Sequence, residues 1–198
     1  MNSSIKRISN SNDLSLHEAL KNSYSKNPKE NMKGYALDKG LSNGNQQVYY
    51  NKDKNQLLMS VAGTHNLRDW GTDIYLGLGK LKNTNRYKEA DRTLKQAKDK
   101  YKPMKTNLVG HSLGHSIASN IGSRDDNILG LNGGYTIGQT TRDNVKHFRN
   151  GGDIVSTFGN SSSNTHQLGN PNFKTHIGFI DALRAHNVDN IRNSGIVV

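Results

Sequence analysis

The clearest chemical signature in the chain lies at residues 110–114, which read Gly-His-Ser-Leu-Gly. In this G-x-S-x-G pattern a serine occupies a sharp turn between a strand and a helix, and the flanking glycines allow the two elements to approach closely. The turn exposes the hydroxyl beside the N–H groups of the helix N-terminus, which attract a developing anion. The pattern predicts that Ser112 is a nucleophile. The alternative is that Ser112 only caps the helix.

An acid and a base must accompany such a serine. A histidine removes the proton from the hydroxyl, and a carboxylate orients the histidine. With this pattern the chain order is serine, acid, histidine. The aspartates that follow the serine are Asp125, Asp126, Asp143, Asp153, Asp181 and Asp189. Asp153 is favoured because it follows a predicted strand and a Gly-Gly pair. An ordinary turn aspartate would also fit that place.

The histidines after Ser112 differ in where the predicted elements put them. They are His147, His166, His176 and His186. His147 falls in the strand before Asp153, and His166 falls in a serine-rich loop close to it, so neither is well placed as the base. His186 and His176 are both serious candidates. His186 is preferred because it follows a predicted helical stretch at residues 177–184.

The oxyanion that serine attack would create needs two N–H donors. The first is the N–H of Leu113, directly after the serine. The second is expected at Thr64, which ends an early apolar strand and whose hydroxyl would add a hydrogen bond. A simple strand-end role for Thr64 is the alternative.

The elements that must position these residues alternate along the chain. The patterns predict helices at 14–20, 87–101 and 113–122, and strands at 48–50, 57–62, 107–109, 127–131 and 145–148. This order predicts an α/β fold with a mostly parallel central sheet flanked by helices, in one small domain. The apolar runs begin after a polar start, so we expect a loosely packed N-terminal arm at 1–33 and the domain at 34–198.

Composition narrows the function classes. The chain has 198 residues, a net charge of +11 and no cysteine. It therefore has no disulfide, thiol nucleophile or thiolate metal site. The charge favours an acidic partner such as an anionic membrane surface or nucleic acid, or serves solubility alone, and no specific nucleic-acid module is evident. No stretch resembles a signal peptide or a transmembrane segment, which favours a cytoplasmic or virion-associated protein.

Several segments together resemble the class 3, fungal-type lipase family of the α/β-hydrolase superfamily. Residues 61–74 are similar to its oxyanion strand and the tryptophan-containing segment after it. Residues 108–118 are similar to its nucleophile elbow, and residues 152–155 to the segment that holds its acid. Residues 185–191 are similar to the histidine segment of small virus- and microbe-type members.

The resemblance implies a catalytic role for each matching residue. Ser112 would be the nucleophile, Asp153 the acid and His186 the base, with Thr64 and Leu113 at the oxyanion hole. It implies a lipid or ester substrate and requires no cofactor and no metal. The expected function is that of a serine carboxylic ester hydrolase, a lipase or phospholipase. Two alternatives stay open: a protease or thioesterase with the same triad, and an inactive hydrolase-fold protein that binds nucleic acid or an acidic partner. The oligomeric state is not indicated.

The chain departs from the family pattern in three places. His115 stands where a small residue is usual, and it would either crowd the elbow or lie on the helix surface. Ser156 stands where a proline is usual. The chain is also short, so any lid must be small. The segment expected to form it is residues 65–78, with Leu67, Trp70, Ile74 and Leu76 as its apolar residues. The alternative for Trp70 is that it packs in the core.

Overall fold

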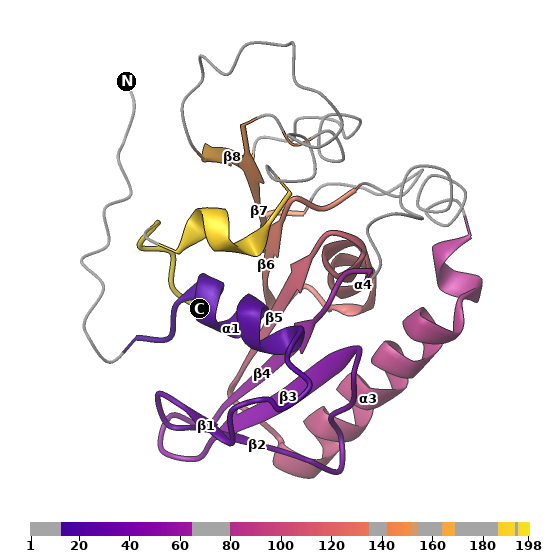
Figure 1. The fold of residues 1–198 in the computed structure, drawn as a ribbon. Helices are drawn as coiled ribbons and strands as arrows, with labels where there is room; N and C mark the ends of the chain where they lie inside the picture. The colour runs from indigo at the N-terminus through magenta and orange to yellow at the C-terminus, as the bar shows by residue number, and fades with distance from the viewer. Residues whose placement is uncertain are drawn as a thin grey trace.

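The computed structural model describes residues 13–64, 80–134, 142–151, 153, 164–168, 186–192 and 194–198. In this part of the chain eight strands form one sheet, in the same order as in the sequence (Figure 1). The strands are β1 (Asn31–Met32), β2 (Tyr35–Leu37), β3 (Gln46–Asn51), β4 (Gln56–Val61), β5 (Lys105–His111), β6 (Asn127–Leu131), β7 (Val145–Asn150) and β8 (Thr165–Leu168). Strands β1 to β4 pair antiparallel, and β4 to β8 pair parallel.

The strands predicted at 48–50 and 57–62 are found as β3 and β4, which form a hairpin. Asn51 pairs with Gln56, and the turn between them includes Asn55 at a φ of 48°. Asparagine tolerates this left-handed conformation better than most residues. The strands predicted at 107–109, 127–131 and 145–148 are found as β5, β6 and β7. Strands β1, β2 and β8 were not predicted, because they are short and carry little apolar alternation.

The central strands are buried on both faces, as a parallel sheet covered by helices requires. In β4, Leu57 and Met59 belong to one hydrophobic cluster, and Leu58 between them belongs to the other. In β5 the same alternation separates Leu108 from Val109.

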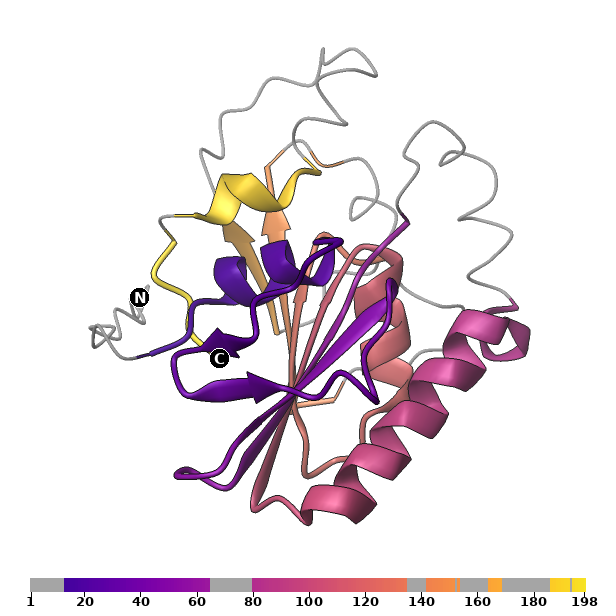
Figure 2. The same cartoon turned by 60° about the horizontal axis from the view of Figure 1, so that its bottom comes forward.

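One face of the sheet is covered by α3 (Asn85–Tyr101) and α4 (Leu113–Ile121), as Figure 2 shows. A short 3-10 helix, η2 (Leu81–Asn83), leads into α3. The Thr84 side chain caps α3 by accepting a hydrogen bond from the N–H of Tyr87. The helix ends before Pro103, where Lys102 takes the left-handed conformation. The predicted helices at 87–101 and 113–122 are therefore confirmed.

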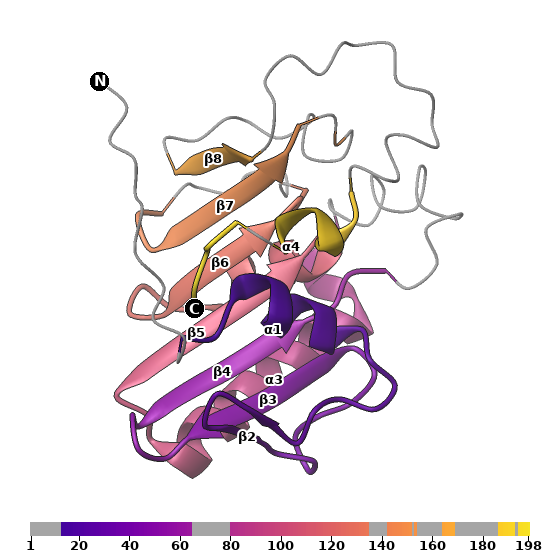
Figure 3. The ribbon, with the colours of Figure 1, turned by 60° about the vertical axis from the view of Figure 1, so that its left-hand side comes forward.

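The opposite face is covered by α1 (Leu16–Ser23) and by η3 (Val188–Ile191), and Figure 3 shows α1 lying across the sheet. Leu16 and Leu20 are fully buried in the cluster on this face. The expectation of a loosely packed arm is therefore wrong for α1, since its amphipathic stripe is part of the core. The domain division at residue 33 stays a prediction.

The chain segments around α1 and η3 also join each other through backbone hydrogen bonds. The N–H of Leu16 donates to the carbonyl of Ile196, and the N–H of Val198 donates to the carbonyl of Leu14. Within the described ranges, no helix is long and apolar enough to cross a membrane. The architecture confirms the predicted α/β fold with a mostly parallel sheet, and it brings the carboxyl ends of β4 and β5 together.

Candidate active site

Ser112 lies at the turn between β5 and α4, in a conformation that side chains rarely adopt. Its φ is 55° and its ψ is −127°, and it is the residue directly before α4. A backbone held in such a sparsely populated region costs about 1–3 kcal/mol and is often found at functional sites. The Ser112 side chain is buried, and its Oγ forms no hydrogen bond with any residue that the structure describes.

The two glycines of the pattern allow this turn to form. A Cβ on Gly110 would lie 2.4 Å from the carbonyl oxygen of Gly114. A Cβ on Gly114 would lie 2.1 Å from the carbonyl oxygen of Val61 in β4. Both separations are far below van der Waals contact, so strand and helix can approach this closely only without side chains at these positions.

Asp153 and His186 lie side by side, although they are 33 residues apart in the chain. His186 Nδ1 is 2.8 Å from Asp153 Oδ1, and each residue is only 1% exposed. A carboxylate only accepts hydrogen bonds, so this contact places the ring proton on Nδ1. Nε2 then has the lone pair that a general base requires.

The backbone of His186 is held against the residue that precedes Ser112. The carbonyl oxygen of His186 lies 2.7 Å from His111 Nε2, and the centroids of the two rings are 4.5 Å apart. The proposed base is therefore beside the elbow, but Ser112 Oγ is not hydrogen-bonded to it here. Catalytic hydrogen bonds are often long in ligand-free structures and tighten when substrate binds.

The other candidate acids and bases have different surroundings. His147 is buried in β7 and accepts a hydrogen bond from the N–H of Gly133, and the His166 ring stacks on Phe148. Asp126 pairs with Lys98, and Asp189 pairs with Lys21. His176 and Asp181 lie outside the described residues, as does the helix predicted at 177–184.

The two expected oxyanion donors, Leu113 and Thr64, both lie near the Ser112 turn. Leu113 opens α4, where the first N–H groups have no partner inside the helix. Thr64 follows β4 and lines a cavity together with His111 and His186. The segment expected to form a lid, including Leu67, Trp70, Ile74 and Leu76, lies outside the described residues.

The departure at His115 has a structural explanation. The ring is neither on the helix surface nor crowded, because it is buried over two glycines of the β6 region. A Cβ on Gly130 would lie 1.8 Å from His115 Nδ1, and a Cβ on Gly133 would lie 2.0 Å from Cδ2. The His115 ring therefore fits after the elbow because Gly130 and Gly133 opposite it have no side chains. Ser156 lies outside the described residues.

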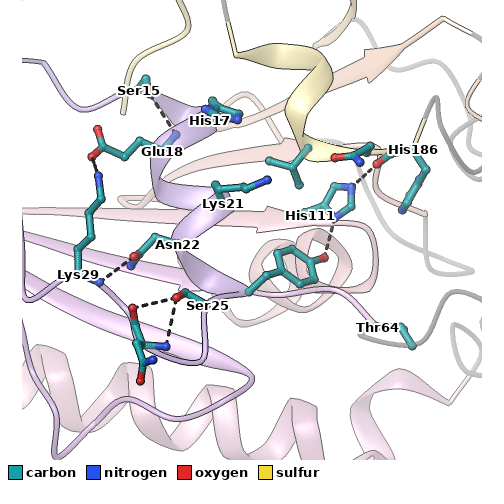
Figure 4. Close-up of a pocket in the computed structure, with 14 residues that line it drawn as sticks. Ser15, His17, Glu18, Lys21, Asn22, Ser25, Lys29, Thr64, His111 and His186 are labelled. Carbon is teal, nitrogen blue, oxygen red and sulfur yellow. Dashed lines mark hydrogen bonds and ion pairs between the residues drawn. The ribbon is translucent and has the colours of Figure 1, made fainter.

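A cavity of about 870 Å³ extends from this site along α1. Figure 4 shows His111, His186 and Thr64 at one end, with His17 and Lys21 on α1 beside them. Most of its lining side chains are polar: Ser15, His17, Glu18, Lys21, Asn22, Ser25, Asn27, Lys29, Thr64, His111, His186 and Asn187. The sequence patterns did not indicate Tyr24, and they gave His111 no role although it lies inside the 110–114 pattern. Within the described ranges, no group of three His, Asp or Glu residues could hold a metal ion.

Comparison with known proteins shows the fold. No protein-family model matches the chain, and no curated protein matches its sequence. Among solved structures it is similar to the Rhizomucor miehei lipase in its propeptide complex, with 13% identity, a TM-score of 0.54, and coverage of 78% of this chain and 67% of that one. It is also similar to Lip2 lipase from Yarrowia lipolytica, with 15% identity, a TM-score of 0.50, and coverage of 72% and 71%.

A third similar structure is that of a triacylglycerol lipase whose catalytic centre is described as a serine protease triad. The identity is 14% and the TM-score 0.52, and the match covers 71% of this chain and 70% of the lipase. The chain has a lipase-like α/β-hydrolase fold. This fold places a serine after a central strand, an acid after a later one and a histidine last. Ser112, Asp153 and His186 follow that order.

Proposed function

We propose that this protein is a serine carboxylic ester hydrolase of the class 3 lipase type, with Ser112, Asp153 and His186 as its triad. The observation that supports this most strongly is the buried His186–Asp153 pair, held beside a strained serine turn. A buried imidazole and carboxylate are costly to desolvate, and a general base is one function that would maintain such a pair.

The mechanism follows from these positions. When an ester occupies the site, His186 Nε2 takes the hydroxyl proton as Ser112 Oγ attacks the carbonyl carbon. Asp153 keeps the ring in the required tautomer and stabilises the imidazolium that forms. His186 then protonates the leaving alcohol, and an acyl-serine remains. Water attacks this ester by the same steps, which releases the acid and restores Ser112.

The tetrahedral intermediates carry a negative charge that must be stabilised. The N–H of Leu113 and the N–H of Thr64 are the donors in this proposal, and the Thr64 hydroxyl adds a third hydrogen bond. The N-terminus of α4 contributes a partial positive charge at the same place. Removing one such donor typically reduces kcat by about 10²–10³.

The substrate in this proposal is an acyl ester of a lipid with a polar head. Lys21 and Lys29 line the cavity along α1, where they form ion pairs with Asp189 and Glu18, and this part of the cavity would receive the alcohol portion of a phospholipid or partial glyceride. The net charge of +11 would favour an anionic membrane surface as the place where substrate is found.

One observation favours a second candidate function, that of an inactive hydrolase-fold protein that binds an acidic partner. Ser112 Oγ forms no hydrogen bond within the described residues, so the nucleophile is not engaged by its proposed base in this structure. Whether Ser112 reacts decides between the two functions.

Labelling with a fluorophosphonate, followed by mass-spectrometric mapping of the modified residue, tests the proposal. We expect label on Ser112 in the wild-type protein, strong reduction in His186→Ala, and retention in His176→Ala. Label that is lost in His176→Ala and kept in His186→Ala would move the base. No label on Ser112, with or without anionic vesicles, would leave the binding function as the better account.

A further inference from the structure

The hydroxyl of Tyr24 connects two parts of the site that are distant in sequence. Tyr24 directly follows α1. Its oxygen lies 2.6 Å from the backbone nitrogen of Gly63 and 2.6 Å from His111 Nδ1. Gly63 precedes the expected oxyanion residue Thr64, and His111 precedes Ser112. The hydroxyl is therefore hydrogen-bonded to the residue before Thr64 and to the residue before Ser112.

The direction of each hydrogen bond in this network can be assigned. The carbonyl of His186 only accepts, so His111 Nε2 carries a proton and donates to it. Burial lowers the pKa of His111 to about 3, so the ring is neutral and Nδ1 accepts. The Tyr24 O–H must then donate to Nδ1, while its oxygen accepts from the Gly63 N–H. Burial also raises the pKa of Tyr24 to about 12, which keeps that proton in place.

The space around the hydroxyl allows little movement. A Cβ on Gly63 would lie 2.5 Å from the Tyr24 oxygen and 2.9 Å from the Cβ of Ser112. The hydroxyl can reach the Gly63 N–H only because this residue has no side chain. The backbone before Thr64, the Tyr24 hydroxyl and Ser112 are thus packed against one another.

A second set of contacts joins α1 to the segment that carries His186. Asp189 lies three residues after His186. Its Oδ1 is 3.0 Å from His17 Nε2, and its Oδ2 is 2.7 Å from Lys21 Nζ. Figure 4 shows His17 and Lys21 on the side of α1 that faces this segment. The helix therefore contacts the histidine segment directly through Asp189 and indirectly through Tyr24 and His111.

We propose that Tyr24 and His111 are positioning residues, which hold the Thr64 backbone and His186 in fixed relation to Ser112. The inference rests on the proposed hydrolase function, and it assigns neither residue a contact with the reacting atoms. The His111 ring fixes the His186 backbone, while Asp153 fixes its side chain. The Tyr24 hydroxyl fixes the His111 ring and the peptide before Thr64 with one group. A displacement of about 1 Å in such a site can reduce the rate by about 10².

The variant Tyr24→Phe removes the hydroxyl and keeps the ring. With a short, water-soluble ester we expect kcat to fall between about tenfold and hundredfold, while KM stays within about twofold. The matched control is Tyr35→Phe, which removes the buried hydroxyl that donates to Gln56 Oε1 at 2.7 Å, away from the site. Its kcat should equal that of the wild type. Tyr24→Phe loses two hydrogen bonds and Tyr35→Phe loses one, so we expect the melting temperature of Tyr24→Phe to be lower by about 2–4 °C.

A second pair of variants keeps the inference testable if Tyr24→Phe folds poorly. A glutamine at position 111 can place an N–H near the position of Nε2, whereas a leucine cannot. We expect His111→Gln to retain more kcat and faster fluorophosphonate labelling than His111→Leu. Equal rates in this pair, or equal kcat for Tyr24→Phe and Tyr35→Phe, would overturn the inference while leaving the hydrolase function intact. A wild-type protein that neither hydrolyses esters nor labels at Ser112 would overturn both.

Discussion

The imidazole ring of His115 lies stacked on that of His147, with centroids 4.9 Å apart and an angle of 14° between their planes. His115 belongs to α4 and His147 to β7, so the pair joins the elbow helix to the sheet. His147 in turn accepts a hydrogen bond from the Gly133 N–H. His115 Nδ1 lies 3.2 Å from Ser119 Oγ, so each ring of the pair has a hydrogen-bond partner, which explains why two histidines are tolerated in a buried position.

The fit of His115 over Gly130 predicts a specific cost of adding one methyl group. Gly130→Ala should lower the free energy of unfolding by about 2 kcal/mol or more, because the Cβ would overlap the His115 ring. Gly44→Ala is the matched control, since a Cβ there meets nothing within 4 Å, and it should be nearly neutral. Urea titration of the wild type, Gly130→Ala and Gly44→Ala measures the change in the free energy of unfolding for each variant.

A double-mutant cycle tests whether His115 is the cause. In the His115→Ala background, Gly130→Ala should cost less than it does in the wild type, because the clashing ring is gone. Additive effects in this cycle would contradict the packing described for His115.

The pairing of Asp153 with His186 predicts a large catalytic effect from the removal of one charge. Asp153→Asn should lower kcat by about 10⁴, because an asparagine can hold the ring in the wrong tautomer. Asp126→Asn is a suitable control, since Asp126 is also buried but pairs with Lys98 at 2.6 Å, away from the site. It should cost about 1–3 kcal/mol of stability and leave kcat unchanged. Steady-state kinetics with a soluble ester, together with thermal melts, separates these outcomes, and an active Asp153→Asn would argue against the triad.

The serine turn and most of the parallel sheet were predictable, because local patterns determine them. The glycines beside Ser112 and the apolar runs of β4 to β6 each have a local physical requirement that the sequence displays. The role of Tyr24 was not predictable, since its partner His111 is 87 residues away and no periodicity relates them. The burial of α1 was missed for a similar reason. Its polar flanking residues dominated the interpretation, although Leu16 and Leu20 already have the spacing of a buried stripe.

The buried histidines predict that stability falls as the solution becomes acidic. Burial lowers the pKa of His111 to about 3 and that of His147 to about 4, and it holds the pKa of His115 well below its ordinary value. Between pH 6.5 and about 4 the unfolded chain therefore binds protons that the native chain does not. Above pH 6.5 the free energy of unfolding has the full contribution of the three neutral rings. Below pH 6.5, and above its native pKa, each buried histidine lowers the free energy of unfolding by about 1.4 kcal/mol per pH unit.

Urea unfolding at pH 7.5, 6 and 5 checks this dependence. Carboxylates change the stability mainly at lower pH, where they become protonated. Asp189 is an example, because hydrogen bonds from Lys21 and His17 hold its pKa below the ordinary value. The variant His111→Gln should show a shallower decline than the wild type, because it removes one of the three groups. A flat profile from pH 7.5 to 5 would mean that these histidines are not buried as neutral rings.

The expected hydroxyl contribution of Thr64 predicts a difference between two conservative variants. Thr64→Ser keeps a hydroxyl and should retain kcat within about threefold. Thr64→Val keeps the shape and should lose about 10-fold or more, up to the 10²–10³ found when a donor is removed from such a site. Equal kcat values for the two variants, with unchanged melting temperatures, would restrict the proposed role of Thr64 to its backbone N–H.

The contacts between α1 and the histidine segment have a consequence for the order in which the protein becomes complete during translation. His17 is synthesised 172 residues before Asp189, its partner. At about 5–20 residues per second, this separation corresponds to a wait of roughly 10 to 30 s on the ribosome. The helix can pack on β4 and β5 in the meantime, because β5 ends at His111, well before the segment with His186 is synthesised. A nascent chain would thus have its serine turn long before its base, and hydrolytic competence would be among the last properties that it acquires.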